Sequence, residues 1–519
     1  MNEAFLYLRK NVMWVLFASL IAGAVATFFA ARGTFVMGWL AASFLLLIGL
    51  TLMVFFWRWA GGGKTLFWVM MLAAVLRLGV GVATSRLVPV YGYDQLPQNS
   101  GYIFYDAYSR DNQAWDLAIS DKSLSSAFSQ EFVTDQYGGL LSISAWIYRY
   151  LSPDAHRPYL IVILTAVISA LGAAFFWQAV RIRWGEAVAR PAVWILALYP
   201  AGIWLGSSQM REAFLIAFSA IAFWGVIVWP TRRWSGILGF VSGLVGLVIF
   251  SSRIALPIFI VLVIWAWLEQ FGRTHEKKWP AWVWVVSLGI GLALVLVTWS
   301  WFQSSMGWDV SMAIKNSGML QTLVRRLGKA WALPVVMGYG VTQPVLPAAV
   351  VDVPSAIFWY IPNILLSLGW YLLAPLLIYG FFTVWTVKKP NDRRLLILTS
   401  VVVILWSLIS AARAGGDQID NPRYRTVFLI WLAFLAGWAW QRARSERDPW
   451  LVRWLAVEGI FLAFFIQWYG SRYYPQVWGT HMDFILMVLL IIGSSGVVLV
   501  GGWIWDRRKK KSSPHTLPE

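Results

Sequence analysis

The chain has 519 residues, of which 59% are hydrophobic and only 13% are charged, and its net charge is +18. This composition excludes a soluble globule, which needs more charge, and the absence of cysteine excludes disulfides and thiol chemistry. The basic residues stand in short clusters between apolar runs, as orientation signals do. We therefore expect membrane lipids as partners and no nucleic acid.

Long apolar runs dominate the chain, and many could cross a hydrocarbon core of roughly 30 Å. Helices are the expected spanning element, because every backbone polar group must be satisfied within lipid. We predict an all-α, polytopic transmembrane helical bundle of about 14 spans, with amphipathic helices in long extracytoplasmic loops. The predicted spans are residues 12–31, 36–56, 66–83, 159–180, 192–205, 213–229, 237–250, 254–268, 282–301, 357–387, 395–412, 427–440, 454–469 and 484–505.

The distribution of Lys and Arg predicts the orientation of these spans. Eight basic clusters, from Arg9/Lys10 to the tail at residues 507–511, fall on one side, which the positive-inside rule assigns to the cytoplasm. We expect a multi-pass protein of the cell (plasma or inner) membrane, with both termini cytoplasmic and an even number of spans. We expect no cleaved signal peptide, because the first apolar run ends at Arg32 without a small-residue cleavage site.

The chain divides into four predicted regions along this topology. Residues 1–64 form an N-terminal transmembrane hairpin, and residues 65–302 form a transmembrane module that includes a first outer loop, 86–158. Residues 303–355 form a second outer loop, and residues 356–519 form the C-terminal transmembrane helices. The two long outer loops are where functional residues are expected to collect.

The first outer loop is rich in acids and aromatic residues. Periodicity predicts a helix over residues 104–119, on which Asp111 lies within an apolar or small stripe and is partly desolvated, as suits a general base. Asp106 could instead pair with Arg110 on the wet face. The alternative interpretation is a pair of interfacial helices, 104–119 and 138–151, with solvated acids.

Two groups of outer arginines point to an anion. Arg211 and Glu212 begin the predicted span 213–229, and a cation at a helix N-terminus favours phosphate, although an ordinary cap is the alternative. Arg413, Arg423 and Arg425 run against the positive-inside trend in one short connection. Phosphate would explain them, because the guanidinium matches its oxygens; the alternative is pairing with neighbouring aspartates.

In this order and on one side of the membrane, these motifs resemble those of the GT-C superfamily of membrane glycosyltransferases. The resemblance covers roughly residues 66–440. Two departures are an acidic loop after the third predicted span instead of the first, and Asp111-Asn112 where many members have two acids. The matching motifs are Asp111-x-x-x-Trp115-x-x-Ala118, Asp135-Gln136-Tyr137-Gly138-Gly139, Ser207-Ser208-Gln209-Met210-Arg211-Glu212 and Arg423-Tyr424-Arg425.

The resemblance implies a GT-C-like fold and a catalytic role for the module at residues 65–302. It implies inverting hexosyl or pentosyl transfer from a polyprenyl-phosphate-linked sugar donor to a hydroxyl of a lipid, glycan or protein acceptor on the extracytoplasmic face. The catalytic base would be Asp111 or Asp106, with Glu212 as a further acid. The donor phosphate would lie on Arg211, Arg423, Arg425 and Arg413, and the substrates would contact Tyr105, Trp115, Tyr137, Gln209 and Tyr424.

No cofactor is certain from the sequence. A divalent cation, Mg²⁺ or Mn²⁺, is possible if Asp111 and Glu212 converge. Two other functions stay open: a polysaccharide polymerase or ligase on lipid-linked glycans, for which His481 would be the outer histidine, and a lipid-linked glycan transporter or flippase. A transporter would place charged residues in mid-membrane, as Arg77 and Glu458 could be.

Overall fold

The structure is a computed structural model that describes residues 2–30, 32–132, 138–273, 310–315 and 317–512. All regular elements in these ranges are helices, which confirms the all-α class. Nine of the described helices are long and apolar enough to cross a membrane, or ten if the bent pair α7–α8 counts as one span. The predicted membrane protein with transmembrane helices is therefore confirmed, whereas the count of about 14 is not reached by this measure.

The helices follow one another with short connections, except at the two outer loops. The first half of the chain contains α1 (Asn2–Ala30), α2 (Phe35–Ala60), α3 (Gly63–Tyr91), η1 (Gln98–Ser100), α4 (Tyr105–Ile119), η2 (Leu124–Phe128), η3 (Gln130–Phe132), α5 (Gly139–Leu151), α6 (Tyr159–Trp184), α7 (Glu186–Leu198), α8 (Pro200–Gly206), α9 (Glu212–Val228) and α10 (Arg233–Arg273). The second half contains α12 (Gly318–Leu327), η4 (Lys329–Trp331), α13 (Ala332–Thr342), α14 (Leu346–Val351), η5 (Ile357–Trp359), α15 (Tyr360–Thr383), η6 (Val384–Thr386), α16 (Pro390–Ala414), α17 (Asp420–Thr426), α18 (Leu429–Glu446), α19 (Pro449–Tyr473), α20 (Pro475–Trp478) and α21 (Phe484–Ser512).

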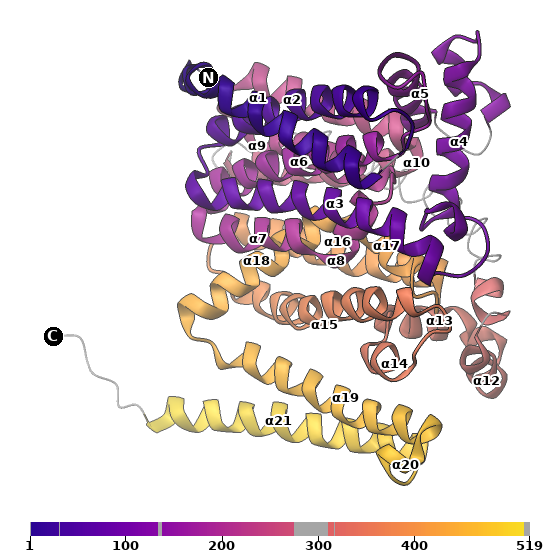
Figure 1. Cartoon of the computed structure of the whole chain (residues 1–519). Helices are drawn as coiled ribbons and strands as arrows, with labels where there is room; N and C mark the ends of the chain where they lie inside the picture. Colours follow the sequence, from indigo (N-terminus) through magenta and orange to yellow (C-terminus); the bar gives the residue numbers. More distant parts are fainter. Residues whose placement is uncertain (1, 31, 133–137, 274–309, 316, 513–519) are drawn as a thin grey trace.

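The long helices run side by side, and most of the short ones gather at one end of the bundle (Figure 1). That end, which we call the loop end, carries α4, α5, α12, α13, α14 and α20. The start of α1 and the last described turns of α21 lie at the opposite end. Arg183 at this opposite end pairs with Glu269 of α10 at 2.9 Å and Asp392 of α16 at 2.7 Å. Which end is cytoplasmic stays a prediction.

Several predicted spans are bent, interrupted or at the lower limit of length for a membrane span. The predicted segment 192–205 is the pair α7–α8, bent by 52° where Pro200 starts a new helix. The predicted segment 213–229 corresponds to α9, which has only 17 residues. The segment 427–440 begins with a break before α18. The predicted span 282–301 lies outside the described residues.

Helix α10 is one element in which the chain reverses direction. Ser251 has extended backbone angles, φ −168° and ψ 100°, that interrupt the helix. The rings of Phe240 and Phe259 lie 6.1 Å apart, whereas residues 19 positions apart in a straight helix are about 28 Å apart. The two halves therefore lie against each other, as the separate predicted segments 237–250 and 254–268 require.

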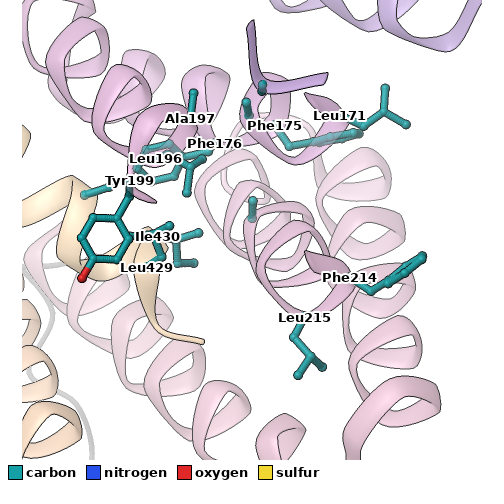
Figure 2. Packing of buried hydrophobic residues seen from close by; sticks show 14 of the residues in the cluster. Leu171, Phe175, Phe176, Leu196, Ala197, Tyr199, Phe214, Leu215, Leu429 and Ile430 are labelled. Carbon is teal, nitrogen blue, oxygen red and sulfur yellow. The ribbon is translucent and has the colours of Figure 1, made fainter. Parts of the chain in front are cut away.

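The centre of the bundle is built from α6, α7, α9 and α18 (Figure 2). Small residues bring these helices close together. A Cβ on Gly172 of α6 would lie 2.8 Å from the Cα of Ala217 in α9, and a Cβ on Gly437 of α18 would lie 2.6 Å from backbone N of Ala192 in α7. Such close contacts between apolar helices maximise van der Waals packing where no hydrophobic force acts between them. This rigid centre supports the elements at the loop end.

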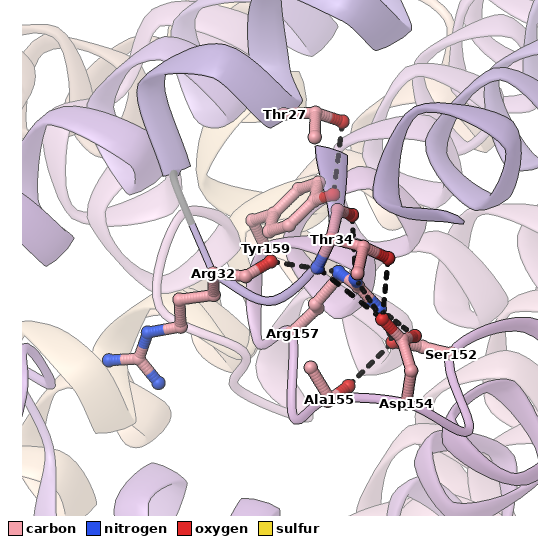
Figure 3. Close-up of polar contacts among 8 residues, drawn as sticks. All are labelled: Thr27, Arg32, Thr34, Ser152, Asp154, Ala155, Arg157 and Tyr159. Carbon is pink, nitrogen blue, oxygen red and sulfur yellow. Dashed lines mark hydrogen bonds and ion pairs between the residues drawn. The ribbon is translucent and has the colours of Figure 1, made fainter. Parts of the chain in front are cut away.

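A buried arginine fastens the N-terminal hairpin to the first outer loop (Figure 3). The fully buried Arg157 donates from Nε to the carbonyl oxygen of Arg32 at 3.0 Å and from Nη2 to that of Thr34 at 2.9 Å. Its Nη2 also lies 2.7 Å from Oδ2 of Asp154. The turn between α1 and α2 needs Gly33 at φ +64°, a conformation that glycine adopts without strain. The turn is thereby held in one place.

Candidate functional site at the loop end

Helix α4 lies across the loop end, roughly perpendicular to the long helices (Figure 1). It carries Asp106 in its first turn and Asp111 in its middle. Five residues on a helix correspond to a rotation of about 140°, so the two carboxylates leave the helix on different faces. They enter two separate polar clusters.

Asp111 is only 3% exposed, as the apolar stripe predicts. The hydroxyl of Tyr102 donates to its Oδ2 at 2.6 Å, and that of Tyr148 donates to its Oδ1 at 2.5 Å. Nε2 of His156 lies 2.9 Å from Oδ2. Burial, and then the neighbouring Asp111 carboxylate, raises the pKa of both tyrosines, so both hydroxyls keep the protons that they donate. We call these four residues the Asp111 cluster.

The Asp111 cluster joins three segments of the first outer loop. Tyr102 precedes α4, Tyr148 lies on α5 and His156 precedes α6. Trp115, a predicted substrate contact, stacks on the ring of His156 at 5.3 Å and 17° and packs edge-on against Tyr148. Both oxygens of Asp111 are thus occupied by protein donors, and the arrangement has the features of a structural anchor.

Asp106 has the opposite surroundings. Its side chain is 49% exposed, and its Oδ2 accepts a hydrogen bond of 2.6 Å from Nη2 of Arg423. Burial alone would raise the pKa of Asp106, but Arg423, Arg110 and Arg211 hold it below its ordinary value. A carboxylate in this position is ionised at neutral pH and open to solvent on one side.

Arg423 on α17 connects three carboxylates from three segments. Nε donates to Oε1 of Glu212 at 2.8 Å, and Nη1 lies 3.5 Å from Oδ1 of Asp420. Burial works against the charge of Arg423, but Glu212, Asp106 and Asp420 together raise its pKa above the ordinary value. We call Asp106, Glu212, Asp420 and Arg423 the Arg423 cluster. Arg423 therefore pairs with a neighbouring aspartate, Asp420, as one of the two interpretations predicts. It also pairs with Asp106 of α4 and Glu212 of α9.

Glu212 is the buried acid of the Arg423 cluster. It is the first residue of α9, where the N-terminal end of the helix dipole favours a negative charge. One oxygen accepts from Arg423, whereas Oε2 is buried and has no hydrogen-bond partner in the described part of the chain. A buried polar atom without a partner is rare, and such atoms are often reserved for a substrate, an ion or a water.

Arg425 points away from the Arg423 cluster, although it is only two residues further along α17. It is fully buried, and its Nη2 donates to the carbonyl oxygen of Gln343 at 3.0 Å and to Oδ1 of Asn421 at 2.9 Å. Its Cζ lies 3.6 Å from the ring centroid of Trp370. Burial lowers the pKa of the Arg425 guanidinium to about 10. These contacts fasten α17 to α15 and to the end of α13, so Arg425 is not brought together with Asp106.

The other predicted contact residues are scattered around the two clusters. Tyr105 is exposed and precedes Asp106 in α4. The ring of Tyr424 lies close to both Arg423 and Arg413, and the Cζ of Arg413 is 4.8 Å from its centroid. Gln209 has φ +56°, a left-handed conformation unusual for a residue other than glycine. Arg211 lies close enough to lower the pKa of Asp106. Tyr137, with the rest of its motif at residues 135–136, lies outside the described residues.

The described acids and histidines form no group of three or more that could hold a metal ion. Asp111 and Glu212, whose convergence would have suggested Mg²⁺ or Mn²⁺, belong to separate clusters and have different partners. The carboxylates that do converge, Asp106 and Glu212, meet on a guanidinium. In the described ranges an arginine supplies the positive charge that these two carboxylates share.

Sequence reasoning missed the partners of Asp111. His156 was visible as one of only four histidines, and Tyr148 as part of the amphipathic segment 138–151, but neither pattern names a partner.

The sequence also left open whether Arg77 is a charge in mid-membrane. Nη1 of Arg77 donates to the carbonyl oxygens of Ala73 at 3.0 Å and Ala197 at 3.2 Å, which joins α3 to α7. Arg77 thus bonds to the backbone of the bundle, and this weakens the transporter interpretation.

A comparison with models of known protein families found no match for this chain, and a search of curated proteins found none either. The geometry of the loop end and the sequence motifs are therefore the basis for the function.

Proposed function

We propose that this chain is an integral membrane glycosyltransferase that moves a sugar from a polyprenyl-phosphate donor to an acceptor hydroxyl on the extracytoplasmic face. The observation that carries the proposal is Asp106, a half-exposed carboxylate that is held by Arg423 beside the buried Glu212. The resemblance to GT-C enzymes adds the substrate class. Transmembrane helices give the chain access to a lipid-linked donor.

In the proposed reaction the acceptor oxygen attacks the anomeric carbon of the donor sugar. The acceptor's proton passes to Asp106, the bond between the anomeric carbon and the phosphate oxygen breaks, and its electron pair leaves with the lipid phosphate. Because the pKa of Asp106 is held low, the carboxylate is ionised, and so unprotonated, throughout the physiological pH range. Asp106 therefore takes the role of base, and Asp111 supports the loop that carries it.

Arg423 has a second part in this mechanism. While Asp106 is ionised, its charge occupies Nη2 of Arg423. When Asp106 takes the proton it loses that charge, just as negative charge grows on the departing phosphate. Nη2 of Arg423 is then free to bind the phosphate, with Arg211 nearby. The movement of one proton would couple deprotonation of the acceptor to stabilisation of the leaving group.

The test uses the purified full chain in liposomes, supplied with short-chain polyprenyl-phosphate sugars and a lipid extract from cell envelopes. Release of free polyprenyl phosphate is measured together with transfer of labelled sugar. A transferase releases polyprenyl phosphate in proportion to the sugar transferred. A flippase moves the intact donor across the bilayer and releases none, and that outcome would reject the proposal.

The base is tested in the same assay. Asp106→Asn is expected to lose transfer, whereas the matched control Asp121→Asn, which changes an exposed acid of the same loop, should keep it. Full activity of Asp106→Asn would move the base elsewhere.

A further inference from the structure

A pocket of about 140 Å³ borders the Asp111 cluster, whose Tyr102 lines it, and shares no residue with the Arg423 cluster. It is enclosed by the turn between α1 and α2, the end of α3, the segment before α4, the start of α6 and the connection from α8 to α9. Among the described residues two arginines line it and no acid does. The residues around it are Ala30, Arg32, Gly81, Thr84, Ser85, Arg86, Ser100, Gly101, Tyr102, Ile103, Pro158, Tyr159, Val162, Ser207, Ser208 and Gln209. We call it the Arg32 pocket.

The guanidinium of Arg32 is available for a ligand. Its side chain points away from Arg157, while its own carbonyl oxygen accepts the 3.0 Å hydrogen bond from Arg157 (Figure 3). Within the described residues its side chain makes no hydrogen bond or ion pair. Arg86 donates from Nε to the carbonyl oxygen of Phe29 at 2.8 Å, which leaves its two terminal nitrogens for another acceptor. The pocket therefore offers two cations that form no ion pair with a carboxylate of the described residues.

Several hydroxyl and amide groups on the rest of the wall can only accept hydrogen bonds. The hydroxyl protons of Thr84, Ser207 and Ser208 are donated to helix carbonyl oxygens, so only the lone pairs of these hydroxyls remain. Gln209, which is 7% exposed, donates from Nε2 to the carbonyl oxygen of Pro158 at 2.9 Å. Its Oε1 is buried and has no partner in the part of the chain that the structure describes. A ligand with hydroxyl groups would satisfy these acceptors.

The surroundings of the Arg32 pocket are those of a lipid boundary. Phe29 on α1 and Leu87 and Val90 on α3 expose large apolar side chains near Arg32 and Arg86. Gly81 makes room for the pocket wall, because a Cβ there would lie 2.6 Å from Cγ1 of Val162 and 2.7 Å from the carbonyl oxygen of Ser207. An amphiphile could place its polar head in the pocket and its chains along these apolar side chains.

We propose that the Arg32 pocket binds the phosphate ester of a polyol, presented as the head of a membrane lipid, with the phosphate on Arg32 and Arg86 and the hydroxyls on the Gln209 wall. The planar guanidinium suits phosphate oxygens, and the acceptor wall suits hydroxyl donors. Part of the pocket comes from the hairpin at residues 1–64, outside the region of the GT-C resemblance. The assignment does not depend on the proposed transfer reaction.

The experiment measures binding by calorimetry with the full chain in phosphatidylcholine nanodiscs. The probe is dioctanoyl phosphatidylglycerol, and the comparison ligands are octyl glucoside, which lacks phosphate, and glycerol 3-phosphate, which lacks the chains. Arg32→Gln with Arg86→Gln is expected to weaken binding of the probe about tenfold or more, from the loss of charge-assisted hydrogen bonds. Arg325→Gln with Arg326→Gln removes the same charge from α12, which lies outside the pocket, and should leave binding unchanged.

The outcomes separate the alternatives. Unchanged binding in the Arg32/Arg86 variant, equal weakening in the Arg325/Arg326 variant, or equal binding of octyl glucoside would each overturn the proposal. Stronger binding of the lipid than of glycerol 3-phosphate supports a lipid source, whereas equal binding identifies a soluble polyol phosphate with the same chemistry. Arg32→Gln alone keeps the test valid if the double variant folds poorly, because its side chain bonds to no described residue.

Discussion

The Asp111 cluster and the Arg423 cluster show how two aspartates on one short helix acquire different roles. Asp111 is buried, and tyrosine and histidine side chains from within the same loop occupy both of its oxygens. Asp106 is half exposed and bonds to Arg423, which is 317 positions away along the chain. A carboxylate whose acceptors are all filled supports structure, whereas one that keeps a face open to solvent can exchange a proton.

The comparison also explains why burial alone is a poor guide to which carboxylate is the general base. Desolvation of Asp111 suggests a general base as long as its neighbours are unknown. Once Tyr102 and Tyr148 donate to it, the carboxylate is stabilised in place, and removing either partner would leave a buried polar group unsatisfied. Solvent exposure and an ion pair with an arginine distinguish Asp106.

The largest expected effect is on the rate of transfer in Asp106→Asn. Loss of a general base should reduce the rate by about 10²- to 10⁴-fold, while stability changes by no more than about 1 kcal/mol, because the Asp106 carboxylate is half exposed. The measurements are polyprenyl phosphate release and the midpoint of thermal unfolding in detergent. A large fall in the unfolding midpoint would show that Asp106, like Asp111, is structural.

Arg423→Gln should give the largest loss of stability. It leaves Glu212 buried beside a neutral side chain, and breaking a buried pair in this way costs about 3–5 kcal/mol. Adding Glu212→Gln removes the unpaired charge and should restore much of the loss, as measured by thermal unfolding of the single and double variants. Absence of this rescue would mean that Glu212 and Arg423 are not coupled.

Asp111→Asn should lower the stability by about 2–3 kcal/mol, because the hydrogen bonds from Tyr102 and Tyr148 lose their charged acceptor. The exposed Asp116 on the same helix provides the matched control, since Asp116→Asn should change stability little. The unfolding midpoint of each variant checks this. A stable but inactive Asp111→Asn would reverse the roles of the two aspartates.

The smallest expected effect is on how the unfolding midpoint falls at acid pH. Arg423 and the neighbouring arginines lower the pKa of Asp106 although partial burial opposes this, so the stabilising contribution of Asp106 is present above the unfolded pKa, near about 4, and is lost as the pH falls below it. Asp106→Asn should therefore flatten the fall in unfolding midpoint between about pH 5 and pH 3.

Asp420 should behave in the opposite way. Burial raises its pKa, so its ionised form opposes folding at neutral pH. Asp420→Asn should raise the unfolding midpoint near about pH 7, and this gain should shrink as acid protonates the wild-type residue. Parallel pH curves for Asp106→Asn and Asp420→Asn would contradict the difference between these two acids.

The sequence by itself determined that the chain is a bundle of membrane helices and that Asp111 faces the interior. Apolar run length sets whether a helix can cross the membrane, and the helical period sets which face a residue occupies. The period also implies that Arg423 and Arg425, two positions apart, point in different directions. The helical period does not show which of these two arginines contacts a carboxylate.

Only the tertiary structure decided the partners. Arg423 meets Asp106 and Glu212 because α17, α4 and the start of α9 come together at the loop end, and their order in space depends on how small residues such as Gly172 and Gly437 allow the central helices to pack. Local patterns do not encode such packing, because the energy of each contact depends on atoms from segments hundreds of residues apart.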